Sequence, residues 1–338
     1  MKAAVLGAGV ISGGHCGGLK NFGYEMVAIV DPIEANRNKF KETYGFQYAV
    51  ADYHEILDMG IDTVAICTPN AFHAQAAIDF LKAGANVICE KPMARTVAEC
   101  DAMIAAAKES KGRLFISHSQ QFAPMHRKMI DEVKSGAIGR PFMASAMFTG
   151  DEFKRMNDPK NWKGTKEISG GGVLIDNGVH MINLLVAMFG KAKDVIADCD
   201  KLVIEPENKG EDTAEIVIRF ENGVMAQVLV TFSAQYNAWP AWYCGAAHRV
   251  EVVGTKGSIA TTNDLPNYMS YKDDGSREKY NNDELPNTIA FGKYFLDCIK
   301  NGTESIITCE DARETVAIVE AAYKSAKEGR RVALSEIG

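Results

Sequence analysis

The first part of the chain alternates short apolar runs with helical patterns, and this alternation constrains the fold more than any other feature. The apolar runs read as buried strands, because they are short and bounded by glycine, proline or polar residues. They lie at residues 2–6, 26–30, 63–67, 86–89 and 114–117. Helical patterns at 36–44, 73–83 and 97–108 separate them. Strands that alternate with helices predict an α/β domain with a doubly wound parallel sheet.

The pattern changes near residue 120. Helical stretches at 124–135 and 172–189 precede apolar strands at hairpin spacing, at 194–205, 214–220, 224–233, 249–253 and 258–262. Helices return at 287–300 and 309–328. Successive antiparallel strands predict an α+β domain with an open, largely antiparallel sheet and helices on one face. We therefore expect domains at 1–120 and 121–338, with the final helix free to pack on the first.

A glycine-rich turn follows the first strand and opens the first helix. Gly7 permits the tight turn, and Gly9 lets the backbone approach a pyrophosphate at the helix N-terminus. Val10 and Ile11 complete the loop, and Ser12 replaces the third glycine of the dinucleotide fingerprint. By itself this motif is weak, since a glycine turn can also lack a ligand. Its position between a strand and a helix predicts a dinucleotide site.

An acidic residue at the end of the second strand strengthens this prediction. Asp31 lies 22 residues after Gly9, near the spacing of the carboxylate that binds the adenosine ribose. The same charge repels a 2′-phosphate, so we expect NAD as the cofactor, with NADP less favoured. Arg37 follows closely and leaves room for a phosphate.

Two later strands end in polar segments. Thr68 and Asn70 follow one strand, with His73 just beyond, and Glu90 and Lys91 follow the next. Ligands in doubly wound sheets bind at the carboxyl ends of the strands. We therefore expect these five residues to line the cofactor, with Lys91 on the nicotinamide side. The alternative for the lysine is an ordinary surface turn.

A glycine run at 170–172 precedes an acidic residue and a histidine. Asp176 and His180 are four residues apart at the start of a predicted helix, so their side chains share a face. A carboxylate beside an imidazole can orient a general base. The alternative is a helix with two polar residues near its start.

Together these motifs resemble the family of glucose-fructose oxidoreductase, inositol dehydrogenase and MocA. The resemblance covers nearly the whole chain. It rests on the order and spacing of segments 7–9, 68–70, 90–92, 170–180, 251–257 and 320–323. It implies an N-terminal Rossmann domain and a C-terminal domain whose open sheet forms homodimers or homotetramers.

The resemblance also implies roles for single residues. Lys91 matches the family's lysine that positions the substrate hydroxyl and joins the proton relay. His180 matches the residue that takes the hydroxyl proton, and Asp176 the one that binds substrate and orients the imidazole. Trp162 matches a tryptophan near the cofactor.

Some positions depart from the family pattern. Ser12 stands for a glycine, and Gln120 and Gln121 precede Phe122 where relatives carry an aromatic residue and an arginine. Asn183 stands where an aspartate is common. These changes leave substrate contacts in the segment around residue 120 open.

Candidate substrate contacts are His118, Gln121 and Tyr236. His118 follows the last Rossmann strand, and Tyr236 belongs to an aromatic-rich segment at 235–247. Aromatic rings stack on the C–H faces of sugars and cyclitols, but they also seal subunit interfaces. For His118 a structural role is equally open.

Charge and composition exclude several classes of protein. The net charge is −7 and no basic stripe occurs, which disfavours nucleic acid and anionic membrane as partners. The histidines show no metal-ligand spacing, so no metal is expected. The 8 cysteines include no C-x-x-C pair, and scattered thiols are typical of a reducing cytoplasm.

The resulting interpretation is an NAD-dependent oxidoreductase that transfers a hydride between nicotinamide and a hydroxyl carbon of a sugar, a sugar derivative or an inositol. Two alternatives remain. One is a redox-assisted glycosidase that keeps NAD bound and shows no net reduction. The other is a non-catalytic NAD-binding regulator, against which Lys91, Asp176 and His180 argue.

Overall fold

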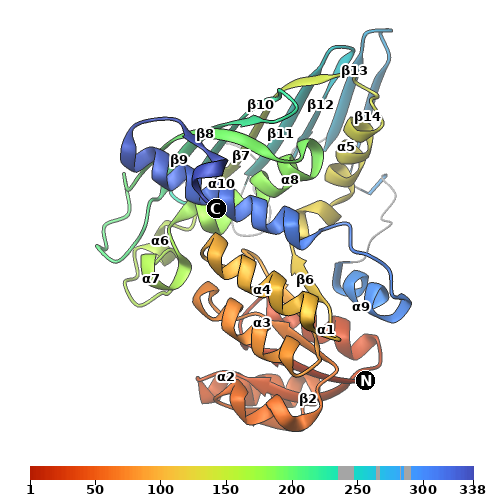
Figure 1. Cartoon of the computed structure of the whole chain (residues 1–338), viewed down its shortest axis with the longest axis vertical. Helices are drawn as coiled ribbons and strands as arrows, with labels where there is room; N and C mark the ends of the chain where they lie inside the picture. Colours follow the sequence, from red (N-terminus) through yellow and green to blue (C-terminus); the bar gives the residue numbers. More distant parts are fainter. Residues whose placement is uncertain (235–246, 264–266, 282, 285–290) are drawn as a thin grey trace. The chain divides into compact units, whose positions relative to one another are not determined.

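The computed structural model describes residues 1–234, 247–263, 267–281, 283–284 and 291–338. The chain divides into two compact units (Figure 1). The first contains Met1–His118 and Ile289–Ala312, and the second contains Ser119–Thr288 and Arg313–Gly338. The first break lies close to the expected boundary at residue 120. The chain returns to the first unit over Ile289–Ala312, a segment that includes the start of the final helix, which the sequence left free to pack there.

The first unit contains a six-stranded parallel sheet. Its strands are β1 (Lys2–Leu6), β2 (Glu25–Val30), β3 (Tyr48–Val50), β4 (Thr63–Ile66), β5 (Asn86–Glu90) and β6 (Leu114–Ser117). The order across the sheet is β3-β2-β1-β4-β5-β6. Strands β2 and β3 are added on one side of β1, and β4, β5 and β6 on the other side. This is the strand order of a dinucleotide-binding Rossmann fold. The predicted doubly wound sheet is confirmed, and only the short edge strand β3 was missed.

Five α-helices belong to this unit. They are α1 (Ser12–Asn21), α2 (Glu34–Tyr44), α3 (His73–Lys82), α4 (Val97–Glu109) and α9 (Phe291–Asn301). Helix α1 packs against α2 and α9, and α3 packs against α4. Glycines allow the α1–α9 contact, since a Cβ on Gly18 would lie 2.2 Å from the carbonyl oxygen of Gly292. The approach of α9 therefore depends on a missing side chain.

The second unit contains a nine-stranded sheet. Its strands are β7 (Pro141–Thr149), β8 (Ala192–Asp200), β9 (Thr213–Phe220), β10 (Met225–Thr231), β11 (Ala247–Gly254), β12 (Gly257–Thr262), β13 (Tyr268–Lys272), β14 (Arg277–Tyr280) and β15 (Val332–Ala333). The order is β14-β13-β12-β11-β7-β10-β9-β8-β15. Among the described residues of this sheet, only the β7–β10 pairing is parallel, so the expectation of a largely antiparallel sheet is confirmed. Strand β7, in the middle of this sheet, was missed.

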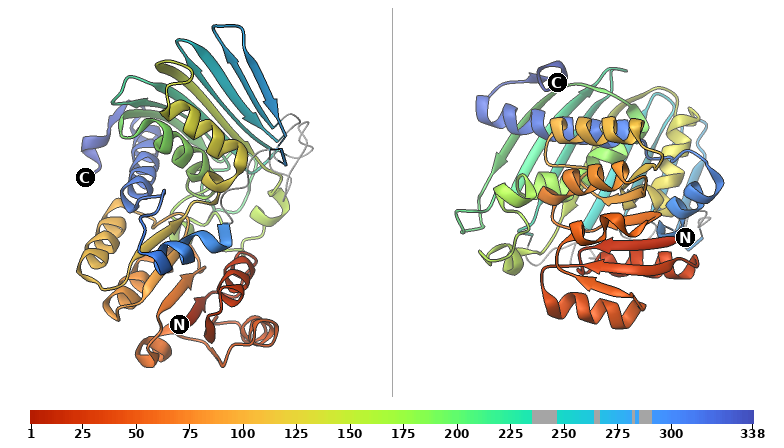
Figure 2. Two further views of the ribbon diagram at one scale, coloured as in Figure 1. Left: turned by 90° about the vertical axis from the view of Figure 1, so that its right-hand side faces the viewer. Right: turned by 60° about the horizontal axis from the view of Figure 1, so that its bottom comes forward.

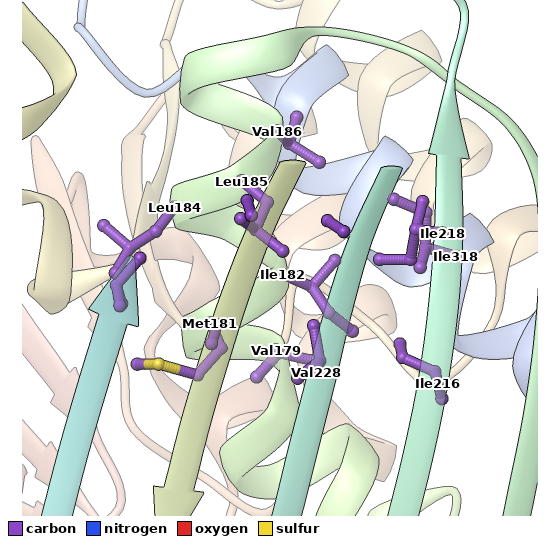
Figure 3. Close-up of a cluster of buried hydrophobic side chains, with 14 of the residues drawn as sticks. Val179, Met181, Ile182, Leu184, Leu185, Val186, Ile216, Ile218, Val228 and Ile318 are labelled. Carbon is purple, nitrogen blue, oxygen red and sulfur yellow. The ribbon is translucent and has the colours of Figure 1, made fainter. Parts of the chain in front are cut away.

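Helices cover one face of this sheet (Figures 1 and 2). They are α5 (Pro124–Lys134), α8 (Val179–Phe189) and α10 (Cys309–Glu328), and the short α6 (Phe153–Met156) and α7 (Lys166–Ser169) lie in the connection after β7. Figure 3 shows Val179 and Ile182 of α8 in a cluster with Val228 of β10 and Ile216 of β9. Burial of these side chains stabilises the unit by about 1.5–3 kcal/mol for each large residue.

One stretch, Lys166–Phe189, is long and apolar enough to pass a test for a membrane span, with a mean hydropathy of 1.5. Of its most apolar part, 89% is buried inside the protein. It contains α8, the central helix of the second unit's core. Its hydropathy is explained by this burial.

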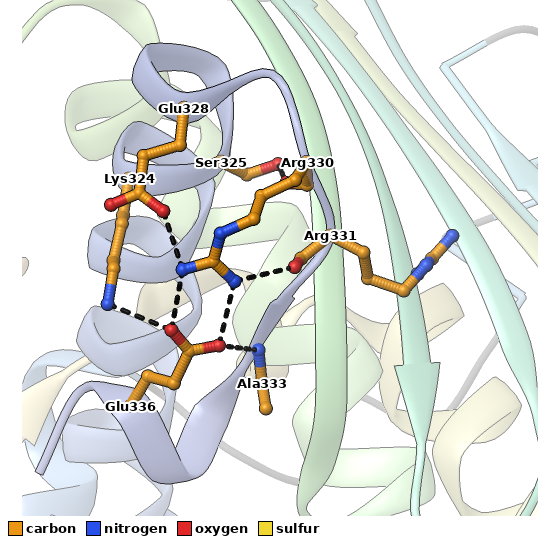
Figure 4. A network of polar contacts seen from close by, with 7 residues as sticks. All are labelled: Lys324, Ser325, Glu328, Arg330, Arg331, Ala333 and Glu336. Atoms are coloured by element: carbon orange, nitrogen blue, oxygen red, sulfur yellow. Dashed lines mark hydrogen bonds and ion pairs between the residues drawn. The ribbon is translucent and has the colours of Figure 1, made fainter.

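The C-terminal segment closes the edge of the second sheet. Strand β15 pairs with β8, and a polar network fixes the turn before it (Figure 4). The Arg330 guanidinium contacts both Glu328 and Glu336, and Lys324 also reaches Glu336. The hydrogen bond from Arg330 holds the pKa of Glu336 well below its usual range.

The glycines of α1 allow a direct test of the α1–α9 packing. We expect Gly18→Ala to destabilise the protein by about 1–3 kcal/mol, because its methyl group would overlap the Gly292 carbonyl. The adjacent Gly17→Ala is the matched control, since no atom lies within 4 Å of its Cβ position. It should stabilise the helix by about 0.5–1 kcal/mol. Denaturant unfolding measures both, and equal stability of the two variants would contradict the packing.

Candidate active site

The glycine loop after β1 has the geometry that a dinucleotide needs. Gly7 has φ +90°, and a Cβ there would lie 2.6 Å from the carbonyl oxygen of Cys67, so only glycine fits. At Gly9 no atom lies within 4 Å of the Cβ position, which leaves the backbone open to a pyrophosphate. Ser12 is fully buried and its hydroxyl accepts a hydrogen bond from the Gly9 N–H at 3.2 Å. The replacement of the third glycine thus braces the loop.

Asp31, at the end of β2, is held by the same loop. One carboxylate oxygen accepts the N–H of Ala8 and the other that of Ile33, both at 2.8 Å. A carboxylate has about four acceptor positions, so two remain for the hydroxyls of a ribose. Arg37 donates instead to the backbone carbonyls of Asp31 and Pro32, at 3.3 and 3.1 Å. The loop and the carboxylate together fit an adenosine dinucleotide.

His73, predicted to line the cofactor, joins two loops at the ends of β4 and β5. Its ring nitrogens lie 2.9 Å from the carbonyl oxygens of Thr68 and Pro92. Burial lowers its pKa despite these two contacts. A neutral imidazole donates to only one of them. The Thr68 hydroxyl is buried with no hydrogen-bond partner among the described residues, and the Lys91–Pro92 peptide bond is cis. His73 therefore positions the segment that carries Lys91.

Asn70, which was also predicted to line the cofactor, is buried at the start of the turn after β4.

Glu90 is the last residue of β5 and Lys91 follows it, with His15 and His118 as neighbours. Oε1 of Glu90 lies 2.7 Å from Nε2 of His15. Burial alone raises the pKa of Glu90, but His15 and the charge of Lys91 outweigh it, and the net shift is downward. Burial, with the charge of Lys91 second, lowers the pKa of His118 to about 3. His118 is therefore a neutral neighbour of the lysine.

The glycine run before Asp176 is fixed by a half-buried glutamate, Glu211. The carboxylate of Glu211 accepts the N–H groups of Gly172 and Leu174, at 2.9 and 3.0 Å, and the hydroxyl of Tyr323 at 2.9 Å. A Cβ on Gly172 would lie 1.8 Å from the Glu211 carbonyl oxygen. Burial raises the pKa of Glu211, and these hydrogen bonds oppose the shift. A glycine is thus required at residue 172 because the backbone of Glu211 approaches it closely.

Asp176 lies in a π-helical turn, Leu174–Gly178, and not in the regular helix that the sequence predicted. The α-helix begins only at Val179, so His180 lies in the first turn of α8. Asp176 is 5% exposed and its Oδ2 lies 2.7 Å from Nζ of Lys163. Turns of this type are rare and concentrate at functional sites. Sequence reasoning did not select Lys163, although it adjoins Trp162.

The remaining predicted contacts have mixed outcomes. The Gln121 amide donates to Asn183 at 2.7 Å, and Asn183 donates to Thr315 at 3.1 Å. This buried chain ties Gln121 into the helical layer. Trp162 is 37% exposed. Tyr236 lies outside the described residues, as do Trp239, Trp242 and Tyr243.

Two buried histidines of the second unit, His126 and His248, were not predicted as site residues. The ring of His248 on β11 lies 4.2 Å from that of Phe148 on β7, and the His180 ring stacks on Phe148 at 6.2 Å and 11°. Burial lowers the pKa of His248 to about 3, with nearby His126 second, and burial lowers the pKa of His126 to about 4.

The candidate residues fall into two groups. Glu90, Lys91 and His118 belong to the first unit, whereas Asp176 and His180 belong to the second. Within the first unit, Lys91 lies close enough to Glu90 and His118 for its charge to lower the pKa of both. Among the described residues, no set of three metal-ligating side chains is found.

Comparison with known proteins identifies the family. A model described as the NAD-binding Rossmann fold of an oxidoreductase family matches residues 1–118, and one for its C-terminal alpha/beta domain matches residues 130–334. The chain belongs to the Gfo/Idh/MocA oxidoreductase family. The family resemblance that the motifs predicted is confirmed. The protein is an oxidoreductase with NAD as its cofactor.

Individual relatives agree with this assignment. The chain is 28% identical to the myo-inositol 2-dehydrogenase of Thermotoga maritima, with 100% of the chain and 99% of the relative covered. It is 25% identical to the D-apiose dehydrogenase of Paraburkholderia graminis, with 99% and 90% covered. The solved structure of levoglucosan dehydrogenase with NADH and levoglucosan has a TM-score of 0.87 at 24% identity, covering 99% of both chains. The fold is therefore that of the family over the full chain.

The buried neutral histidines predict a loss of stability in acid. The pKa values of His126 and His248 are lower in the folded protein than the usual 6.5, so protonation favours the unfolded chain. Their contribution is complete above about pH 6.5 and is lost as the pH falls toward the folded values. Between about pH 6.5 and pH 5, each histidine should lower the free energy of unfolding by up to about 2 kcal/mol.

Denaturant unfolding of the wild type and of His248→Phe across this range tests the expectation. The variant should show a shallower decline than the wild type. Parallel curves for wild type and His248→Phe would exclude this origin of acid sensitivity.

Proposed function

We propose that this protein is an NAD-dependent dehydrogenase of a polyhydroxylated small molecule, a sugar, a sugar derivative or an inositol. The observation that carries the proposal is the π-helical turn of the second unit, which holds a buried Asp176 against Lys163 one turn before His180. A positioned carboxylate near an imidazole suits general-base chemistry. The NAD-binding domain of the same chain supplies the redox partner.

In the proposed reaction, the residues handle a proton and a developing negative charge. The glycine loop and Asp31 would hold NAD, whose nicotinamide ring would supply the hydride acceptor. Lys91, as an ammonium ion, stabilises the alkoxide that forms on the substrate oxygen. His180 takes the hydroxyl proton, and the charge of Asp176 stabilises the imidazolium. Lys163 fixes the Asp176 carboxylate for this role.

The substrate class rests on the relatives and on the residue types. The relatives include dehydrogenases named for myo-inositol, D-apiose and levoglucosan, which are all polyhydroxylated. Another relative, from Sphingobium, is named for a carboxylated semialdehyde, so membership of the family alone does not name the substrate. The acidic net charge of −7 disfavours a phosphorylated substrate.

Net reduction of NAD distinguishes the proposal from its alternatives. Absorbance at ~340 nm reports the reduced nicotinamide while sugars, inositols and glycosides are offered with NAD or NADP. Net NADH formation from a free polyol supports the dehydrogenase. Release of sugar from a glycoside without net NADH supports the redox-assisted glycosidase, and no reaction with any compound supports the regulator.

Lys91→Ala and His180→Ala test the catalytic assignment. Each should lower turnover by about 10²–10⁴-fold, since each removes a positioned group that acts on the reacting oxygen. NAD binding, followed by fluorescence titration, should be retained. Lys82→Ala and His54→Ala replace exposed residues of the same types and should keep full activity. Turnover at the wild-type rate in both active-site variants would refute the assignment.

Asp31→Asn tests the choice of cofactor. We expect its affinity for NAD to fall about 10-fold, because the ribose loses a charged hydrogen-bond acceptor. Its affinity for NADP should rise, since the repulsion of the 2′-phosphate is removed. Calorimetric titration with both cofactors measures the ratio, and Glu42→Gln on α2 removes an equal charge as a control. An equal change for NAD and NADP would indicate a distorted loop and not a lost selector.

A further inference from the structure

Four aromatic side chains of the second unit form a cluster at one end of its sheet. Phe148 of β7 and His248 of β11 are register partners, and both are buried, at 8% and 9% exposure. His180 of α8 stacks on Phe148. His126 lies in the first turn of α5, a helix that packs against α8. We call His126, Phe148, His180 and His248 the histidine cluster.

The hydrogen-bonding state of His126 is fixed by its backbone partner. Its Nδ1 lies 3.0 Å from the carbonyl oxygen of Gln120. A carbonyl only accepts, so Nδ1 carries the proton of the neutral ring. Nε2 is then a bare acceptor. It is buried and has no hydrogen-bond partner among the described residues.

His248 repeats this condition on the neighbouring element. Its Nε2 is also buried without a hydrogen-bond partner in the described part of the chain. Burial keeps both rings neutral at physiological pH. Buried polar atoms are normally satisfied, and an unpaired one destabilises the folded state. Two such nitrogens in the histidine cluster indicate that a ligand completes them.

We propose that Nε2 of His126 and Nε2 of His248 bind hydroxyl groups of the polyol substrate, next to the Phe148 ring on which His180 stacks. A hydroxyl suits these nitrogens, since it donates to a bare acceptor and accepts from an N–H. An anion would need charged or multiple donors, which neutral imidazoles do not supply. The inference rests on the proposed function and extends it to two specificity-determining residues on α5 and β11.

The test replaces each histidine by phenylalanine, which keeps a ring of similar size and removes the nitrogens. With the best polyol of the substrate panel, His126→Phe and His248→Phe should raise KM by about 10-fold or more, as a lost hydrogen bond does. The affinity for NAD should not change. His248→Phe should unfold at or above the wild-type temperature, because an unpaired buried nitrogen has been removed. His126→Phe also loses the hydrogen bond to the Gln120 carbonyl and should unfold at a slightly lower temperature. His54→Phe, on the surface of the first unit, is the matched control and should leave KM and the affinity for NAD unchanged.

Deoxy analogues identify the hydroxyl that each histidine binds. For one deoxy-sugar or deoxyinositol, wild type and variant should show the same KM, because the bond is already absent. Unchanged KM in both variants with every polyol would overturn the inference. A KM increase that accompanies a lower unfolding temperature and is equal for all deoxy analogues would assign the histidines a structural role only.

Failure of the inference and failure of the proposed function have different signatures. If Lys91→Ala and His180→Ala turn over normally, the proposed function fails, whatever the histidine variants show. If no polyol is oxidised, binding of myo-inositol and D-glucose to the NADH complex is measured by calorimetry. Binding that is lost in His248→Phe would support the subsite without the reaction, and no binding to the wild type would overturn it.

Discussion

The Glu211 carboxylate is the interaction on which the second unit's site depends. It draws the backbone of the glycine run, the start of the π-helical turn and the Tyr323 hydroxyl of α10 to one point. Hydrogen bonds from several donors to one carboxylate are strong because the acceptor is charged. The position of Asp176 follows from this anchor. The function of the site thus begins with a residue that has no part in the chemistry.

Local patterns predicted much of the fold. Strands β1 and β6 and helix α10 have the bounds expected from the sequence, and α3 differs by one residue at its end. Strand β7 was missed because its middle, Ala144 to Ala146, contains small residues with weak strand propensity. It is nevertheless central, since pairing with both β10 and β11 stabilises it. Tertiary context therefore determined what propensity did not.

The site residues could be predicted where a local motif is typical of one function. They could not be predicted where a side chain contacts residues from distant parts of the chain. The glycine loop and Asp31 are joined within the first unit as expected, through the Ala8 amide. The spacing of Asp176 and His180 predicted that the two side chains share a helix face. It did not predict the π-helical turn that contains Asp176. Lys163, Glu211 and His248 carry no local signature, because their roles depend on which segments the fold brings near them. His73 was expected at the cofactor, but its ring nitrogens face backbone carbonyls.

The return of residues 289–312 to the first unit has a consequence for biosynthesis. The Rossmann sheet is complete once β6 has been made, yet α1 lacks its α9 neighbour until residue 301 has been added. During translation, which proceeds from the N-terminus, the glycine face of α1 must wait while the whole β7–β14 sheet is synthesised. The cofactor domain is therefore the first to begin folding and among the last to be finished.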